Sequence, residues 1–449
     1  VHPHDMKAAT NEKAIEQLAP PAVVVIPMSM HFGAPCTPLV KAGDHVKVGQ
    51  KIGEFHGLGA PIHASVSGTV KAVEPRPYSM GGNITSVVIE NDMQDEVSEE
   101  VQAPADPNAL SVEEMVEIVK NAGIVGMGGA TFPTHVKITS GIGKVNTVII
   151  NGAECEPYIT GDHRTMLERP EEIIGGAKFL AKMFGVDKVV IGVEDNKRNG
   201  IDAMNKVIAE QKAPVVVEPL RCRYPQGGEK QLCQAITGRQ VPPGGLPADI
   251  GCAVFNINTT CAIYRALTTG MPVVRKIVTV SGSGVVEPKN LECPIGTPVS
   301  NLLDACGGLK DGTYKLIAGG PMMGMAQYTA DISVAKGTGA ILAFCENEEK
   351  TVENPQCIRC GKCVSVCPMH LEPLFMYQYA SKGMVEELND AHIMDCMECG
   401  ACSYICPARM HLTHMFKTGK QLVKDKAAAD RAAAEAKKKA EEAKEAAAK

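Results

Sequence analysis

Hydrophobic and polar positions follow several periods along the chain, and each period predicts a different kind of element. Between Ser111 and about Thr269, helical spacing alternates with short apolar runs. The segment SVEEMVEIVKNAG predicts an amphipathic helix that Ser111 caps, with Glu114 at the third helical position and Gly123 at its end. The runs TVIIN and KVVIGVED predict buried strands, and a helix opened by Pro170 lies between them. This strand, helix, strand order predicts a right-handed crossover in a parallel sheet, and therefore an α/β domain.

Before and after this segment the pattern changes. From Pro38 to Val73, short apolar alternations separated by glycines predict short strands with tight turns. From about Pro272 to Phe344, RKIVTVSGSG and GTYKLIAGGPMMG predict strands with a helix, VSNLLDACGG, between them. Leu371 to Leu388 has helical spacing without strand alternation.

The C-terminal segment after Val423 is rich in Ala, Lys and Glu and has no large apolar residue, so we expect a solvated single helix or disorder. The chain is therefore predicted to be a multidomain α/β protein. Its expected segments are a β-rich domain over 1–105, an α/β domain over 106–270, a small α+β domain over 271–348, a mainly helical domain over 349–418 and a tail over 419–449.

Composition narrows the possible functions. The chain has 449 residues, of which 45% are hydrophobic, so it can bury several cores. Its net charge of −6 argues against a nucleic-acid-binding role, which needs a basic face. No apolar run approaches the roughly 18 residues that a membrane span needs, so we expect a protein that is soluble or peripheral to a membrane partner.

Two cysteine runs carry the clearest chemical signal. CIRCGKCVSVCP begins at Cys357 and CMECGACSYICP begins at Cys396, and both have the spacing C-x2-C-x2-C-x3-C-P. This spacing is typical of [4Fe–4S] clusters. Structural zinc is the alternative, but it needs only four ligands and gives no reason for the third and fourth Cys of each run. A disulfide framework fits less well, because the 17 cysteines are odd in number and no signal peptide is visible.

In paired cluster sequences the fourth Cys of each run binds the other cluster. We therefore expect two [4Fe–4S] clusters, one held by Cys357, Cys360, Cys363 and Cys406, and the other by Cys396, Cys399, Cys402 and Cys367.

A Gly-rich loop, GIVGMGGATFPTHVK, follows the first helix of the α/β segment. It does not follow a strand, so it is not the dinucleotide fingerprint of a Rossmann fold, and such a loop can also be a simple turn. Its glycines nevertheless let backbone N–H groups approach a phosphate-bearing cofactor, and Lys137 can supply positive charge. The motif NGAECEP follows at the end of a predicted strand, where α/β sheets bind ligands. Glu156 in this motif can also simply cap a turn, and Phe132 can be a core residue.

These motifs carry a resemblance. GMGGATFPTHVK, NGAECEPYITGDHRTMLERP, YPQGGEKQL and FNINTT resemble, in order, the NADH- and FMN-binding subunit of respiratory complex I. The whole architecture resembles more closely the C subunits of the Rnf complex. The resemblance implies a biotinyl- or lipoyl-like N-terminal domain, a flavin domain, a soluble-ligand-binding β-grasp domain and a ferredoxin-like domain with two clusters. The N-terminal hairpin at His56 to Gly59 has no Lys, so no swinging cofactor arm is expected there.

The resemblance also implies roles for single residues. Phe132 and Glu156 would face NADH, and the residues expected to hold FMN are Gly126, Gly128, Lys137, Asn151, Glu154, Glu229, Asn256 and Thr259. Hydride would pass from NADH to FMN without a side-chain acid or base, and electrons would leave through the two clusters. The chain departs from the complex I pattern at Met127, Ala153 and Lys230.

The resemblance implies an NADH/NAD⁺ oxidoreductase subunit of an ion-translocating electron transport complex. It would lie peripherally on the cytoplasmic face of the cell membrane, with a ferredoxin-like iron–sulfur subunit as its partner. Two alternatives share the architecture: a cobalamin reductase of a bacterial microcompartment, and a non-catalytic electron-transfer or assembly scaffold. FMN content separates the scaffold from the other two.

Overall fold

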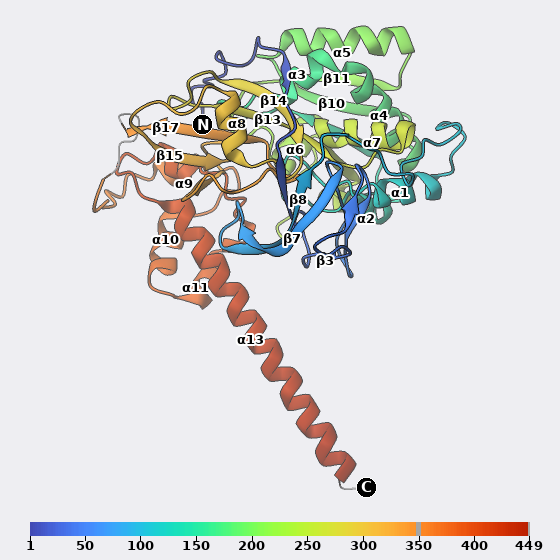
Figure 1. The fold of residues 1–449 in the computed structure, drawn as a ribbon. Helices are drawn as coiled ribbons and strands as arrows, with labels where there is room; N and C mark the ends of the chain where they lie inside the picture. The colour runs from blue at the N-terminus through green and yellow to red at the C-terminus, as the bar shows by residue number, and fades with distance from the viewer. Residues whose placement is uncertain (347–351, 448–449) are drawn as a thin grey trace. The chain divides into compact units, whose positions relative to one another are not determined.

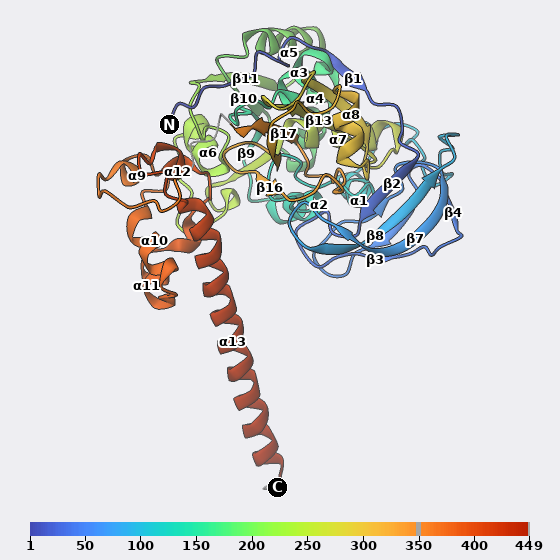
Figure 2. The same cartoon turned by 60° about the vertical axis from the view of Figure 1, so that its left-hand side comes forward.

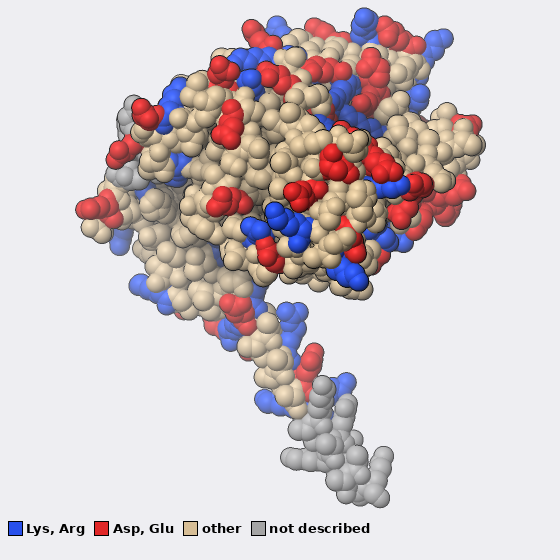
Figure 3. Space-filling view, in the orientation of Figure 1, with Lys and Arg blue, Asp and Glu red and all other residues tan. Residues whose placement is uncertain are grey.

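The computed structural model describes residues 1–346 and 352–447, with side chains up to residue 438. The chain divides into two compact units, residues 2–349 and residues 350–449, which we describe separately (Figures 1 and 2). Among the described helices, none is both long enough and apolar enough to cross a membrane. Lys and Arg are interspersed with Asp and Glu over the face seen in Figure 3.

The first unit begins with a β-rich module of two small antiparallel sheets. One sheet has the order β2 (Val23–Pro27), β8 (Asn83–Asn91), β7 (Gly68–Pro77) and β4 (His45–Val46); the other has β3 (Thr37–Pro38), β5 (Lys51–Glu54) and β6 (Ile62–His63). Gly43 and Gly49 have positive φ values of 93° and 85°, which explains the glycine-punctuated turns of the sequence. The hairpin between β5 and β6 carries the predicted His56 to Gly59 tip.

The α/β domain has a four-stranded parallel sheet, as the sequence pattern predicts. The strand order is β11 (Val215–Leu220), β10 (Val189–Glu194), β9 (Thr147–Gly152) and β12 (Cys252–Asn256). The helices are α1 (Val112–Asn121), α2 (Thr134–Gly141), α3 (Gly161–Glu168), α4 (Pro170–Phe184), α5 (Arg198–Gln211), α6 (Glu229–Thr237) and α7 (Ile257–Thr269), with a 3-10 turn at Pro247–Ile250. Ser111 and Glu114 form the predicted capping box of α1. Asn151 and Asn256 are register partners on β9 and β12, so two amide side chains share the carboxyl edge of the sheet.

The third module is built on a six-stranded sheet. Its order is β1 (Ile15–Gln17), β14 (Lys289–Pro294), β13 (Arg275–Ser281), β17 (Ala340–Cys345), β15 (Thr313–Ala318) and β16 (Met325–Gln327), and α8 (Val299–Ala305) packs in its core. β1 pairs in parallel with β14, so residues 15–17 belong to this sheet although they fall within the β-rich domain predicted over 1–105. Residues 5–17, which we call the N-terminal strap, therefore cross from the α/β domain to this sheet (Figure 1).

The second unit is helical throughout its described regular elements. They are α9 (Lys362–Ser365), α10 (Pro373–Ser381), α11 (Val385–Asp390), a 3-10 turn at Ile393–Asp395, α12 (Ala401–Ile405) and α13 (Leu412–Ala447). The core includes Met376, Leu388 and Phe416, all at most 1% exposed. The predicted boundary at residue 418 falls inside α13, because this helix starts in the core and continues without interruption into the Ala-rich tail.

Candidate functional site: two cysteine pockets and a glycine-rich loop

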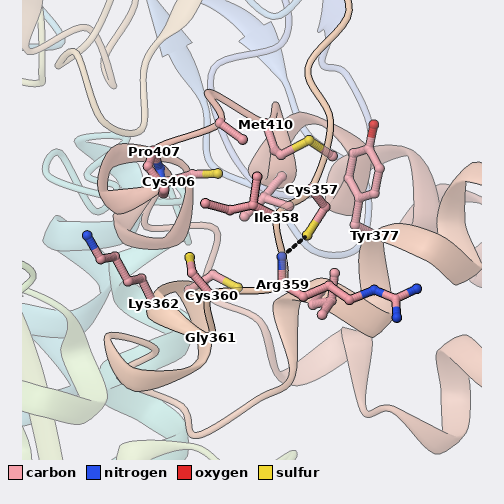
Figure 4. Close-up of a pocket in the computed structure, with 14 residues that line it drawn as sticks. Cys357, Ile358, Arg359, Cys360, Gly361, Lys362, Tyr377, Cys406, Pro407 and Met410 are labelled. Atoms are coloured by element: carbon pink, nitrogen blue, oxygen red, sulfur yellow. Dashed lines mark hydrogen bonds between the residues drawn. The ribbon is translucent and has the colours of Figure 1, made fainter.

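The first cysteine pocket gathers Cys357, Cys360 and Cys363 with Cys406 from the second run. Figure 4 shows the sulfurs of Cys357, Cys360 and Cys406 turned toward one central space. The rest of the lining is mostly apolar and includes Ile358, Leu374, Tyr377, Met410 and Leu412. The structure thus brings together the four cysteines that the run spacing assigns to one cluster.

The second cysteine pocket gathers Cys396, Cys399 and Cys402 with Cys367 from the first run. Its walls include Met369, Leu371, Met376 and Phe416. Each run therefore gives three cysteines to one pocket and its fourth to the other. Cys357 and Cys360 are exposed, whereas Cys399 is buried, so the two pockets differ in their access to solvent.

The backbone around the two pockets repeats. Arg359 and Glu398 have φ values of 54° and 57°, and each donates its N–H to the sulfur of the run's first Cys at 3.4 Å. Gly361 and Gly400 follow with φ values of 73° and 78°, a conformation that glycine adopts without strain. N–H groups aimed at sulfur stabilise negative charge there, so both turns suit thiolates.

The chemistry of these thiols also fits a bound cluster. Burial raises the pKa of Cys396 to about 11 and that of Cys402 to about 12, because an isolated thiolate is poorly solvated in an apolar pocket. A metal centre supplies the positive charge that keeps such sulfurs deprotonated. The residues present therefore fit an iron–sulfur group.

The glycine-rich loop lies against the start of α7. The N–H of Met127 donates to Thr259 Oγ1 at 2.9 Å, and the N–H of Gly126 donates to the carbonyl of Phe132 at 3.0 Å. A Cβ on Gly128 would lie 2.6 Å from Asn256 Nδ2, so any larger residue would push this amide aside. The loop is thus held against the same sheet edge that carries Asn256.

Three further predicted residues gather at this edge. Asn151 Nδ2 donates to the carbonyl of Gly227 at 2.8 Å. Lys137 Nζ donates to Glu229 Oε1 and to the carbonyl of Val254, each at 3.0 Å. The ammonium expected to meet a phosphate is therefore held by a carboxylate and a strand carbonyl in this structure.

Glu154 lies in the loop that follows β9, beyond the carboxyl edge of the sheet. Its carboxylate accepts the N–H groups of Asp162 at 2.6 Å and His163 at 3.1 Å, at the first turn of α3. Burial raises the pKa of Glu154 to about 7, although the cation of Lys7 acts in the opposite direction. Asp162 in turn accepts from Asn256 Nδ2 at 2.7 Å, which links Glu154 to the other site residues.

The two residues expected to face NADH lie in different surroundings. The ring centroid of Phe132 is 6.0 Å from that of Phe32, which is 56% exposed and belongs to the β-rich module. Glu156 accepts from the Tyr224 hydroxyl at 3.3 Å and from the N–H of Met322 at 3.1 Å. Glu156 is therefore held by side-chain and backbone donors from two other segments, and a Cβ on Gly320 would meet its carboxylate at 2.1 Å.

Several residues at this site were not predicted. Lys7 donates to backbone carbonyls of the loop that carries Glu154, and Lys197 Nζ donates to the carbonyl of Ala153 at 2.7 Å. Asp162 lies within the motif GDHR, so its position in the sequence was a usable signal. Tyr224 opens the motif YPQGGEKQL, so it too had a usable signal. Lys7 and Lys197 lie in segments without a recognisable motif, and only the fold brings them to the site.

Comparisons with known protein families agree with this arrangement. The family model described as the Nuo51 FMN-binding domain matches residues 119–265, and that of a 4Fe-4S dicluster domain matches residues 349–407. The RnfC barrel sandwich hybrid domain matches residues 1–94, and the SLBB domain matches residues 277–326. These matches define the class: a multidomain protein with an FMN-binding domain and an iron–sulfur dicluster domain.

Curated relatives extend over most of the chain. The C subunit of the Na⁺-translocating ferredoxin:NAD⁺ oxidoreductase complex of Acetobacterium woodii is 45% identical over 88% of this chain and 89% of its own length. Its proton-translocating counterpart from Clostridium ljungdahlii is 43% identical over 87% of this chain and 86% of its own length. The chain belongs to this family, the C subunits of ion-translocating ferredoxin:NAD⁺ oxidoreductase complexes.

Proposed function

We propose that this chain passes electrons between NAD(H) and a ferredoxin-like partner as the flavin and iron–sulfur subunit of an ion-translocating oxidoreductase complex. The observation that supports this most directly is that one chain combines two four-cysteine pockets with a glycine-rich loop at the carboxyl edge of a parallel sheet. FMN, when bound, takes two electrons together from a nicotinamide and releases them one at a time. Two [4Fe–4S] clusters, each of which accepts one electron, would receive the electrons that the flavin releases singly.

The residues of the sheet edge suit the binding of this flavin. Gly126 and Gly128 let the loop backbone approach the cofactor closely, and Thr259 fixes the loop through the N–H of Met127. Asn151 and Asn256 offer amide groups from adjacent strands. Lys137 would exchange its contact with Glu229 for the flavin phosphate, at a place where the ammonium is only partly buried.

The nucleotide would lie on the side of Phe132 and Glu156. Phe132 presents an aromatic face for stacking, and the carboxylate of Glu156 can accept hydrogen bonds from ribose hydroxyls. Glu154 is bound to backbone N–H groups and would keep the loop in place near the flavin. Hydride transfer between the nicotinamide and flavin rings needs no proton from a side chain. The role of these residues would therefore be to bind and orient the two rings and to exclude water.

The electron path would continue to the eight cysteines. Cys357, Cys360, Cys363 and Cys406 would hold one cluster, and Cys367, Cys396, Cys399 and Cys402 the other. The more exposed first pocket is the natural exit toward a ferredoxin-like subunit, on the cytoplasmic face of a membrane to which this chain would bind peripherally. The names of the relatives favour this function over a cobalamin reductase or a non-catalytic scaffold.

The decisive experiment uses the full chain, purified without oxygen. FMN released by denaturation should approach one per chain, and NADH should bleach the flavin absorbance and then the cluster absorbance. Dithionite serves as the control, because it reduces flavin and clusters without a nucleotide site. A protein that contains FMN and responds to dithionite but not to NADH would contradict the dehydrogenase function and support the scaffold alternative.

A further inference from the structure

The N-terminal strap places a buried ammonium beneath the loop that carries Glu154 and Glu156. Lys7 is only 5% exposed. Its Nζ donates to the carbonyl of Glu154 at 2.9 Å, to that of Glu156 at 3.0 Å and, in a short contact, to that of Ile159. An ammonium has three N–H donors, so all of them are directed at this one loop.

Further hydrogen bonds join the same two segments. The N–H of Tyr158 donates to the carbonyl of Asp5 at 2.8 Å, and the hydroxyls of Thr10 and Thr160 are 2.8 Å apart. The N–H of Ile15 donates to the Glu168 carboxylate at 3.0 Å. The strap is therefore attached along the loop and along the helix α3 that follows it.

The loop needs such support because its backbone is unusual. Glu154 and Tyr158 have φ values of 46° and 68° although neither is a glycine. Non-glycine residues keep this sparsely populated conformation only where their surroundings hold them. Three carbonyls that converge on one point would also repel one another without a cation between them, and buried carbonyls without a donor are costly.

Lys7 acts on the backbone of the loop, and the carboxylates serve other contacts. The carboxylate of Glu154 accepts from the first turn of α3, and that of Glu156 accepts from Tyr224 and Met322. Burial lowers the pKa of Lys7, and the charged or titratable groups that face it include Glu154, Lys197, Glu194 and Cys155. The contact with the three carbonyls thus fixes the backbone positions from which the side chains of Glu154 and Glu156 project.

We propose that Lys7 is a positioning residue of the nucleotide site: it holds residues 154–159 in the backbone conformation that aims Glu154 at the flavin and Glu156 at NAD(H). This inference rests on the proposed function of the sheet edge. It assigns to the N-terminal strap a part in nucleotide binding that acts through the backbone of the loop.

The test compares Lys7→Met with Lys13→Met in the full chain. Both variants remove one ammonium from the strap, but Lys13 donates to the carbonyl of Pro288 in an exposed contact. In the protein without nucleotide, Lys7→Met should increase amide hydrogen exchange at Tyr158, Asp162 and His163 at least about tenfold, because local opening becomes easier. Lys13→Met should leave exchange at these amides unchanged.

Nucleotide binding supplies the second measurement. Lys7→Met should weaken NAD⁺ binding, measured by calorimetry without turnover, by about tenfold, and should raise the KM for NADH by a similar factor. The kcat should change by less than about threefold, because the flavin and the clusters remain in place. A merely structural residue would instead lower the yield of folded protein and leave the KM of the folded fraction unchanged.

Thr10→Val provides a milder variant in case Lys7→Met does not fold. It removes one hydroxyl between the strap and Thr160, and it should raise the KM for NADH about two- to fivefold together with faster exchange at Tyr158. Unchanged exchange and unchanged KM in the folded variants would overturn the positioning role. If the parent protein itself neither binds NAD⁺ nor is reduced by NADH, the proposed function fails. If the parent is active and the variants behave like it, only the positioning role fails.

Discussion

The proposed role of Glu156 in nucleotide binding can be tested at this one residue. It is held by Tyr224 and by the backbone of Met322 rather than capping its own turn. Replacing Glu156 with Gln keeps the shape and removes a charge-assisted acceptor, a loss of about 1.5–3 kcal/mol. We expect NADH to bind roughly ten- to a hundredfold more weakly, measured by titration of flavin reduction.

Two controls accompany the Glu156→Gln variant. FMN content and cluster reduction by dithionite should equal those of the parent, and Glu218→Gln, at an exposed position of β11, should have no effect. If Glu156→Gln is reduced by NADH as readily as the parent, the carboxylate serves only its contacts with Tyr224 and Met322.

Glu154 predicts a pH dependence of stability. Its pKa is raised from 4.5 to about 7 in the folded protein, so the folded state binds a proton more tightly than the unfolded state. The contribution of this group to the free energy of unfolding is fully present below about pH 4.5 and is lost as the pH rises toward about 7. Melting temperatures between these values should therefore fall less steeply with pH in Glu154→Gln than in the parent. Parallel curves would show that Glu154 does not titrate in this range.

The sequence proposes candidate site residues where their signal is local or carried by a motif. The eight cysteines have a fixed spacing, and Asn151, Gly128 and Asn256 lie in recognisable motifs at predicted strand ends. Lys7 could not be found in this way, because a lysine becomes a buried ligand of three carbonyls only through a contact that spans 147 residues to Glu154. The partners of Glu156, Tyr224 and Met322, lie 68 and 166 residues further along the chain.

Among the elements, helix ends followed their sequence signals closely. Ser111 with Glu114 begins α1, Pro170 begins α4 and Gly185 ends α4 with a φ of 64°. β1 was missed because its three residues gain their partner 275 positions later in β14, and no local pattern encodes such a pairing. The predicted boundary at residue 418 lies inside α13, because the first turns of this helix pack in the core of the second unit while the later turns form the Ala-rich tail.

Two substitutions in α13 can test which part of this helix stabilises the cysteine pockets. Phe416 is 1% exposed and lines the second pocket. Phe416→Ala should lower the free energy of unfolding of this unit by about 3–5 kcal/mol, seen as earlier loss of cluster absorbance in denaturant. Lys424→Ala, at an exposed position of the same helix, should not shift this transition. Equal transitions for both variants would mean that the pocket wall does not depend on Phe416.

The hairpin between β5 and β6 makes a prediction about covalent modification. Biotin and lipoate are attached through an amide to a lysine, and the tip from His56 to Gly59 has none. The intact mass should therefore show neither cofactor. A mass increment matching either one, mapped to Lys41, Lys47 or Lys51, would contradict this expectation.

For the molecule as a whole, the cysteine pockets predict the metal content. Two [4Fe–4S] clusters require about eight iron atoms per chain. Cys399→Ser should lower the iron content by about four, because it removes one ligand of a single cluster, whereas Cys345→Ser, outside both pockets, should leave it unchanged. Iron analysis and electron paramagnetic resonance of the reduced protein measure both. Zinc in place of iron would contradict the assignment.

The N-terminal strap also has a consequence for the order of events during biosynthesis. Its residues leave the ribosome well before those of β14, yet β1 is fixed only when Asn290 to Glu292 have been made, since these are its pairing partners. Domains tend to fold as they emerge, but the loop from Glu154 to Ile159 cannot reach its final form until the strap is anchored on that later sheet. Loading of the flavin should therefore follow translation of the third module, and a nascent chain that stops before residue 289 should expose an unfinished loop from Glu154 to Ile159.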